Sequence, residues 1–188
     1  MAFFSLVQLF YWLSLATWFG GVVFIAISMP VISRTIREND PTLPTVLSVN
    51  LDGEHSSLLA GTIVVNLLVM LTRFELALSG VIALALAGQW VMLHGLQLGM
   101  SVLRTCLFVG AVALALYDWR IVTPRILKYR NEYIEHADEP ELAEAAKSQF
   151  DHYFKEVVTV LLAETVLLSG MILFSSSIST AQAFTIHP

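Results

Sequence analysis

Glu164 is the residue of this chain whose type and position most strongly suggest chemistry. It lies near the middle of the apolar segment 153–175, which is long enough to cross a membrane as a helix. An ionisable side chain at mid-membrane depth is costly and usually faces the bundle interior or a water-filled cavity. A carboxyl group there can bind a proton or a cation. The alternative is a protonated, structural glutamate that hydrogen-bonds to Thr17, Gln8 or Ser79 on a neighbouring helix.

Three further residues are candidates for binding. Arg104 lies near the start of another apolar segment, where its side chain either extends to the nearby membrane surface, pairs with a carboxylate or binds an anion. Arg104 therefore joins Glu164 as a candidate substrate or proton site. His55 and His152 stand beside Glu54 and Asp151, and nitrogen and oxygen ligands suit a divalent metal. Ordinary histidines at the membrane surface are the alternative interpretation.

The composition requires a membrane around these residues. Of the 188 residues, 56% are hydrophobic and 13% are charged, whereas soluble domains are roughly 45–50% apolar and about 25% charged. Too little polar surface remains to cover a globule in water, which excludes a soluble enzyme and a disordered chain. The net charge of −5 offers no basic surface to nucleic acid. The lipid bilayer is therefore the first expected partner.

Four apolar segments are long enough to cross the hydrocarbon core as helices. They are residues 6–33, 74–96, 99–119 and 153–175. The apolar stretch 57–71 is short for a span, and we expect it to form an interfacial helix between spans 1 and 2. The sequence thus predicts an all-α fold, a four-transmembrane-helix bundle that makes residues 1–188 a single integral membrane domain.

The basic residues predict the orientation of this bundle. With four spans, the loops after spans 1 and 3 lie on one side of the membrane and hold nine of the 10 Lys and Arg residues. Those nine are Arg34, Arg37, Arg73, Arg120, Arg125, Lys128, Arg130, Lys147 and Lys155. Basic loops remain in the cytoplasm. We therefore expect a multi-pass protein of a bacterial-type inner (plasma) membrane with both termini non-cytoplasmic.

The connection between spans 3 and 4 is predicted to be helical. The third helix continues past Pro124, with a kink there, and Asp138 and Pro140 are typical of the first turn of a new helix. Together the two arms predict a long cytoplasmic hairpin between spans 3 and 4 that projects beyond the lipid. Its basic and acidic arms favour a solvated, salt-bridged hairpin over a docking surface for a partner.

Four short motifs are distributed over most of the chain, from about residue 6 to residue 174. They are WFGGVVF at 18–24 with Pro30 after it, AGTIV at 60–64, DWRIVTPR at 118–125, and an aromatic-rich segment at 150–154. Together they resemble the transmembrane protein 205-like family of unknown function. The residues that carry this resemblance, with helix packing as their default role, are Trp18, Gly20, Gly21, Pro124 and Arg125.

This family is similar, more distantly, to copper-resistance D membrane proteins and to HemJ-type protoporphyrinogen oxidases. Those resemblances imply copper uptake or a haem-dependent oxidation. The histidines of such relatives correspond here to Phe10 or Tyr11 in the first span and to Phe154 at the start of the fourth. A haem held by two histidines needs both at similar depth in the spans. We therefore predict no cofactor, with haem or copper as the alternative.

Three classes of function fit these observations. The favoured one is a small transporter or efflux-related protein for a cation or drug, with Glu164 as its binding site. The second is an accessory subunit of a larger membrane complex, or a self-associating protein, in which Glu164 and Arg104 meet partner residues. The third, and the least supported, is a haem- or metal-dependent membrane oxidoreductase. The residues favour a non-enzymatic role over an enzymatic one.

Overall fold

The computed structural model describes residues 2–39, 55–92, 98–136 and 139–186, and its described residues form helices and no strand. The elements are α1 (Ala2–Asn39), α2 (His55–Met92), α3 (Leu98–Tyr117), a π-helical turn η2 (Asp118–Val122), α4 (Thr123–Glu135) and α5 (Pro140–Ile186). Four helical segments are long and apolar enough to cross a membrane: Ser5–Ile36, Leu59–Val91, Gly99–Glu135 and Glu141–Ser176. The predicted all-α fold is confirmed, and it contains four helical segments that are long and apolar enough to span a membrane.

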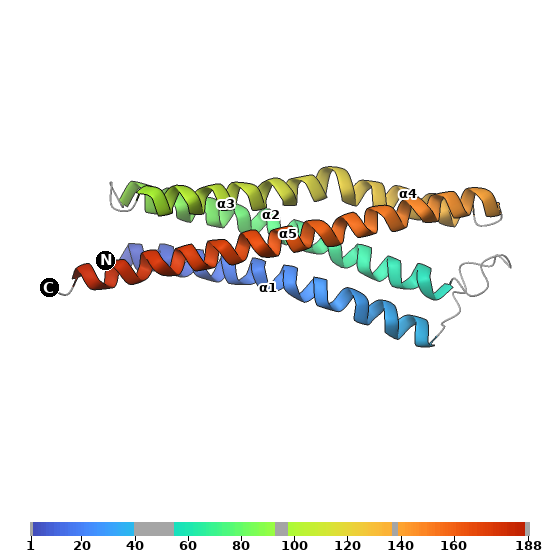
Figure 1. The fold of residues 1–188 in the computed structure, drawn as a ribbon, viewed down its shortest axis with the longest axis horizontal. Coiled ribbons are helices and arrows are strands. Elements are labelled where there is room, and N and C mark those ends of the chain that lie inside the picture. The colour runs from blue at the N-terminus through green and yellow to red at the C-terminus, as the bar shows by residue number, and fades with distance from the viewer. Residues whose placement is uncertain (1, 40–54, 93–97, 137–138, 187–188) are drawn as a thin grey trace.

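The helices run side by side along one elongated bundle (Figure 1). The start of α1 and the end of α5 lie at the same end of this bundle, and the end of α4 and the start of α5 lie at the opposite end (Figure 1). Helix α1 packs against α2 and α5, while α3 and α4 pack against α5 and, less extensively, against α2. Side chains from all four long helices therefore meet along a shared core.

The core is formed by side chains spaced alternately three and four residues apart, which we call the core stripe of each helix. In α1 the buried residues are Tyr11, Leu15, Trp18, Val22, Ile25 and Met29. In α5 they include Val157, Leu161, Glu164, Leu168, Met171 and Ser175. This spacing is typical of helices that cross at a small angle and interlock side chains along their length.

The core stripes of α2 and α3 follow the same spacing, except for two successive four-residue steps around Glu75 in α2, and carry most of the buried charged residues. In α2 the stripe contains Leu68, Leu71, Glu75, Ser79, Ile82, Leu86 and Gln89. In α3 and η2 it contains Ser101, Arg104, Phe108, Ala111, Ala115, Asp118 and Val122. Charged residues at stripe positions must face neighbouring helices, because the apolar residues above and below them fix the rotation of the helix.

The prediction of a separate interfacial helix at residues 57–71 is wrong. These residues form the first part of α2, which continues to Met92 without a break. The core stripe runs through both parts in one register, and no proline interrupts it. The second apolar segment long enough to cross a membrane therefore extends from Leu59 to Val91 and does not begin at residue 74. Glu75 lies near the middle of this segment and not at its start.

The third span also extends further than the predicted range 99–119. Helices α3 and α4 are joined through η2 without an intervening loop. Pro124 lies in the first turn of α4, where its missing N–H and its ring disturb the hydrogen bonds of the preceding turn. The wider π-helical turn accommodates this disturbance, and Asp118, its first residue, is buried.

The two arms of the predicted hairpin correspond to α4 and the beginning of α5, which run antiparallel (Figure 1). These arms do not stand apart from the bundle. Arg130 Nε donates a hydrogen bond to Thr62 Oγ1 of α2 at 3.1 Å. The ring of Phe150 lies against Gly61, where an added Cβ would come within 3.1 Å of Phe150 Cζ. The first part of α2 therefore packs alongside the arms.

Leu68→Ala tests the continuity of α2. Because Leu68 is buried in the core stripe, we expect the variant to lose about 2 kcal/mol of stability, as for other Leu truncations that leave a cavity. Thermal unfolding of the purified protein in detergent measures this loss. Met70→Ala is the matched control, since Met70 is exposed on the same helix. Equal effects of the two substitutions would contradict the packing of residues 57–71 into the bundle.

Candidate functional site

Three acidic side chains from three elements meet in the core of the bundle. Glu164 of α5, Glu75 of α2 and Asp118 of η2 are only 1%, 3% and 7% exposed. The Glu75 and Glu164 carboxyl groups interact directly, and both also interact electrostatically with Asp118. We call these three residues the carboxyl cluster. It lies within three of the four apolar helical segments that are long enough to cross a membrane.

Only part of the carboxyl cluster is hydrogen-bonded. Asp118 Oδ2 accepts hydrogen bonds from Thr72 Oγ1 at 2.8 Å and Thr123 Oγ1 at 3.2 Å. Within the described part of the chain, both oxygens of Glu164 and Oε1 of Glu75 are buried without a hydrogen-bond donor. A buried polar atom without a partner is costly and is rare in native proteins. Asp118 is thus held by neighbouring hydroxyl groups, whereas Glu75 and Glu164 have mainly each other as polar neighbours.

The hydrogen-bond donors considered for Glu164 from the sequence do not reach it. Thr17 Oγ1 donates to the carbonyl of Leu13 in its own helix at 2.7 Å, and Ser79 Oγ donates to that of Leu76 at 2.9 Å. Gln8 does not donate to Glu164 either, because both carboxyl oxygens lack a partner. The structure therefore gives no support to a glutamate held by neighbouring hydroxyl or amide groups.

Trp18 adjoins the same cluster. Its indole Nε1 is buried without a hydrogen bond of normal geometry and lies beside the Glu75 carboxyl group. Next to it along α1, a Cβ at Gly21 would lie 3.2 Å from Leu71 Cδ1, whereas one at Gly20 would have no atom within 4 Å. Trp18 and Gly21 thus each contact a residue of α2, whereas a side chain at Gly20 would contact none.

The other two motif residues lie just beyond the cluster. Pro124 follows the π-helical turn, and Arg125 is exposed on α4. The Arg125 guanidinium carbon lies 5.4 Å from the centre of the Tyr153 ring, and its Nη1 donates to the Tyr153 hydroxyl at 3.3 Å. Arg125 therefore contributes to the packing of α4 against α5.

Arg104 forms a second polar layer in the core and does not extend to the membrane surface. It is 2% exposed, and its Nη2 donates to Gln89 Oε1 at 2.7 Å. Its guanidinium carbon lies 5.3 Å from the centre of the Tyr11 ring, whose hydroxyl is 2.6 Å from Ser175 Oγ. Among the described residues Arg104 has no ion-pair partner, and its Nε has no acceptor.

The two predicted site residues, Glu164 and Arg104, do not meet. On α1, Tyr11 lies beside Arg104 and Trp18 lies beside Glu75. These two positions are two helical turns apart, or about 10 Å at ~1.5 Å per residue. The core therefore carries a cationic layer nearer the chain termini and the carboxyl cluster further along the bundle.

The described residues provide no metal site. No three His, Cys, Asp or Glu side chains among them are placed to hold a metal ion, and this includes the carboxyl cluster. His152 is exposed, with its ring 5.3 Å from that of Tyr153. The side chain of His55 lies outside the described residues.

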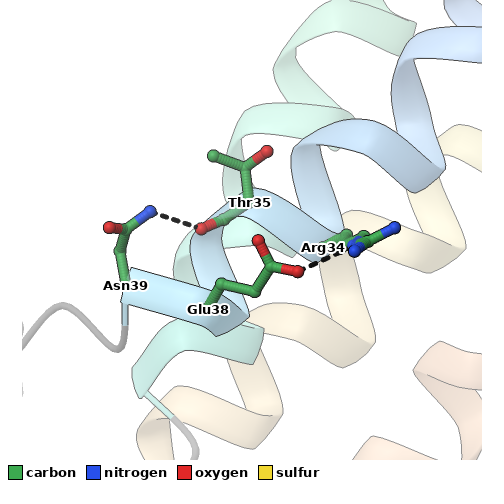
Figure 2. Close-up of polar contacts among 4 residues, drawn as sticks. All are labelled: Arg34, Thr35, Glu38 and Asn39. Carbon is green, nitrogen blue, oxygen red and sulfur yellow. Dashed lines mark hydrogen bonds and ion pairs between the residues drawn. The ribbon is translucent and has the colours of Figure 1, made fainter.

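The ion pair at the end of α1 is local and does not reach the cluster. At the end of α1, Arg34 Nε lies 2.7 Å from Glu38 Oε1, and Asn39 Nδ2 donates to the carbonyl of Thr35 at 2.8 Å (Figure 2). Exposed pairs of this kind contribute little to stability. Arg34 therefore pairs within its own helix.

No protein-family model, curated protein or solved structure matches this chain. Glu75 and Asp118 lie at the ends of the predicted spans 74–96 and 99–119, so the sequence alone did not mark them as site residues. The three-four spacing of apolar residues was the signal that identifies both as core positions.

Substitutions at Glu164 and Asp118 should change stability in opposite directions. Glu164→Met removes two buried oxygens that lack partners at similar side-chain volume, so we expect a gain of about 1–3 kcal/mol. Asp118→Leu removes the acceptor of two threonine hydroxyls, so we expect a loss of about 1 kcal/mol. Thermal unfolding in detergent measures both. Destabilisation by Glu164→Met would show that this carboxyl group supports the fold.

Proposed function

We propose that this protein is a small transporter of a bacterial-type inner membrane that moves a cation or cationic drug in exchange for a proton. Glu164 and Glu75 form the shared binding site. The observation that carries the proposal is the burial of the Glu164 carboxyl group, with both oxygens lacking a hydrogen-bond donor, directly beside Glu75. A site retained at such a cost to stability is typical of a functional residue.

The proximity of Glu75 and Glu164 allows a proton and a cation to compete for the same site. Two carboxylates side by side in a membrane interior cannot both remain ionised without a compensating cation. The pair therefore holds either a proton or a monovalent cation. Replacement of one by the other leaves the charge of the core unchanged, so the exchange avoids the cost of moving net charge into the bundle.

The neighbouring polar residues support this exchange. The positive charge of Arg104, about two turns away, offsets one ionised carboxylate in the core. Thr72 and Thr123 hold the Asp118 side chain through Oδ2, and Asp118 Oδ1 has no partner. Asp118 is thus a positioning residue at the edge of the pair. Its place in a π-helical turn fits this role, because such turns frequently occur at functional sites.

The distribution of exposed residues supports a cytoplasmic location for α4 and the beginning of α5. Exposed charged residues gather on these segments, among them Arg125, Lys128, Glu141, Glu144 and Lys155. At the other end of the bundle the exposed residues of α1 and α2 are apolar and include Leu6, Leu9, Leu13, Leu84 and Val91. With basic segments in the cytoplasm, both termini are non-cytoplasmic.

Glu164→Gln tests transport. The substitution keeps the side-chain volume and removes the titratable group, so we expect at least tenfold slower proton movement in proteoliposomes driven by a gradient of potassium or phenylbutylamine. A pH-sensitive dye inside the vesicles reports the flux. Glu144→Gln is the matched control, since Glu144 is exposed on the same helix.

Unchanged flux in Glu164→Gln would overturn the transport proposal. A second readout is the infrared carbonyl band of a protonated carboxyl group, which we expect to be lost in Glu164→Gln and on addition of the transported cation. If the variant instead loses a stoichiometric membrane partner in mild detergent, the role of an accessory subunit replaces transport.

Cysteine labelling tests the orientation. Cys106 is the single cysteine, so Cys106→Ala gives a background without thiols. In that background we expect a membrane-impermeant maleimide to label Ser5→Cys in intact cells, and to label Glu144→Cys only after permeabilisation. The reverse pattern would place the termini in the cytoplasm.

A further inference from the structure

A groove of about 250 Å³ lies between α1 and α2. Its lining is apolar except at one end and includes Phe24, Met70 and Phe74. Trp18 and Glu75 also line it, so the groove reaches the carboxyl cluster. Its volume is slightly below the ~300–1,000 Å³ of pockets that hold drug-sized ligands. A compact ligand therefore fits it.

The outer wall of the groove belongs to the apolar surface of the bundle. Phe24, Met70 and Phe74 are 66%, 53% and 54% exposed. All three lie in the apolar segments Ser5–Ile36 and Leu59–Val91, each long enough to cross a membrane. A membrane-spanning surface of this composition contacts hydrocarbon. A ligand that reaches this groove must therefore dissolve in the lipid.

The inner end of the groove has the opposite chemistry. Glu75 Oε1 and Trp18 Nε1 are buried polar atoms without hydrogen-bond partners, and both residues line the groove. Glu75 is the only ionisable lining residue. A carboxyl group favours a cationic or hydrogen-bond-donating ligand, and the face of an indole ring also attracts a cation. The groove thus matches an apolar body with one positively charged end.

Gly21 keeps the groove open. A Cβ at this position would lie 3.2 Å from Leu71 Cδ1, at the far end of a flexible side chain. A larger side chain at Gly21 would therefore fill space in the groove, which it lines. The adjacent Gly20 is exposed, and a Cβ there would meet no atom within 4 Å. The two neighbouring glycines provide a matched pair of sites for a test.

We propose that this groove binds a lipophilic monovalent amine that enters from the bilayer, with its apolar body between α1 and α2 and its ammonium group at Glu75. This inference rests on the proposed function, because Glu75 belongs to the proposed exchange site. It adds the substrate class and the path of access. An uncharged lipid chain could occupy the apolar part of the groove but would leave Glu75 and Trp18 without partners.

Equilibrium binding of phenylbutylamine to the protein in lipid nanodiscs, measured by calorimetry, tests the proposal. We expect Gly21→Leu and Glu75→Gln to weaken binding at least tenfold, and Gly20→Leu to leave it unchanged. Phenylbutanol has a similar apolar body without the charge, so we expect it to bind at least tenfold more weakly and to be insensitive to Glu75→Gln. Phe24→Ala, at an exposed lining residue, should weaken amine binding several-fold without disturbing the core.

Wild-type binding in both Gly21→Leu and Phe24→Ala would overturn the proposal. Equal binding of phenylbutanol and phenylbutylamine would also overturn it and would indicate a site for lipid chains. Thermal unfolding checks that each variant is folded. If amine binding behaves as expected but Glu164→Gln still transports at the wild-type rate, the groove proposal stands and the transport proposal fails. If transport requires Glu164 but the groove variants bind normally, only the groove proposal fails.

Discussion

The structure depends on one repeated contact, the packing of core stripes whose residues alternate three and four positions apart. Each stripe fixes the rotation of its helix, so a charged residue at a stripe position cannot turn away from its neighbours. Glu75 and Glu164 face each other for this reason, since Leu71 and Ile82 hold α2 while Leu161 and Leu168 hold α5. The carboxyl cluster is therefore a consequence of apolar packing and not of mutual attraction between its members.

The class of fold and the unusual position of Glu164 could be predicted from the sequence because both depend on local composition. Few charged residues and long apolar segments require membrane helices, and an acid in the middle of such a segment is conspicuous. Glu75 was missed because Arg73 beside it suggested the end of a span. Arg73 is in fact exposed within a continuous helix. Arg104 was expected near a membrane surface, but the rotation of α3, which only the assembled bundle fixes, buries it.

The two halves of the bundle also differ in a way that no single helix reveals. Helices α1 and α2 present exposed apolar residues along most of their length, including Phe24, Ile27 and Val31. Helix α4 and the beginning of α5, packed beside them, present exposed charges instead. The exposed surface thus changes from apolar along most of α1 and α2 to charged on α4 and the beginning of α5. The last turns of α1 are also charged, at Arg34 and Glu38.

The π-helical turn shifts the phase of the third span by one residue. Continuing the three-four spacing from Asp118 and Val122 would place Arg125 in the core. Instead Ile126 and Tyr133 are buried, and Arg125 is exposed. Regularising this turn to α-helix without deleting a residue would rotate α4 by about 100° relative to α3 and carry that arginine inward. The turn thus acts as a one-residue insertion. It allows the apolar helix α3 and the charged helix α4 to continue into each other while Arg125 stays exposed.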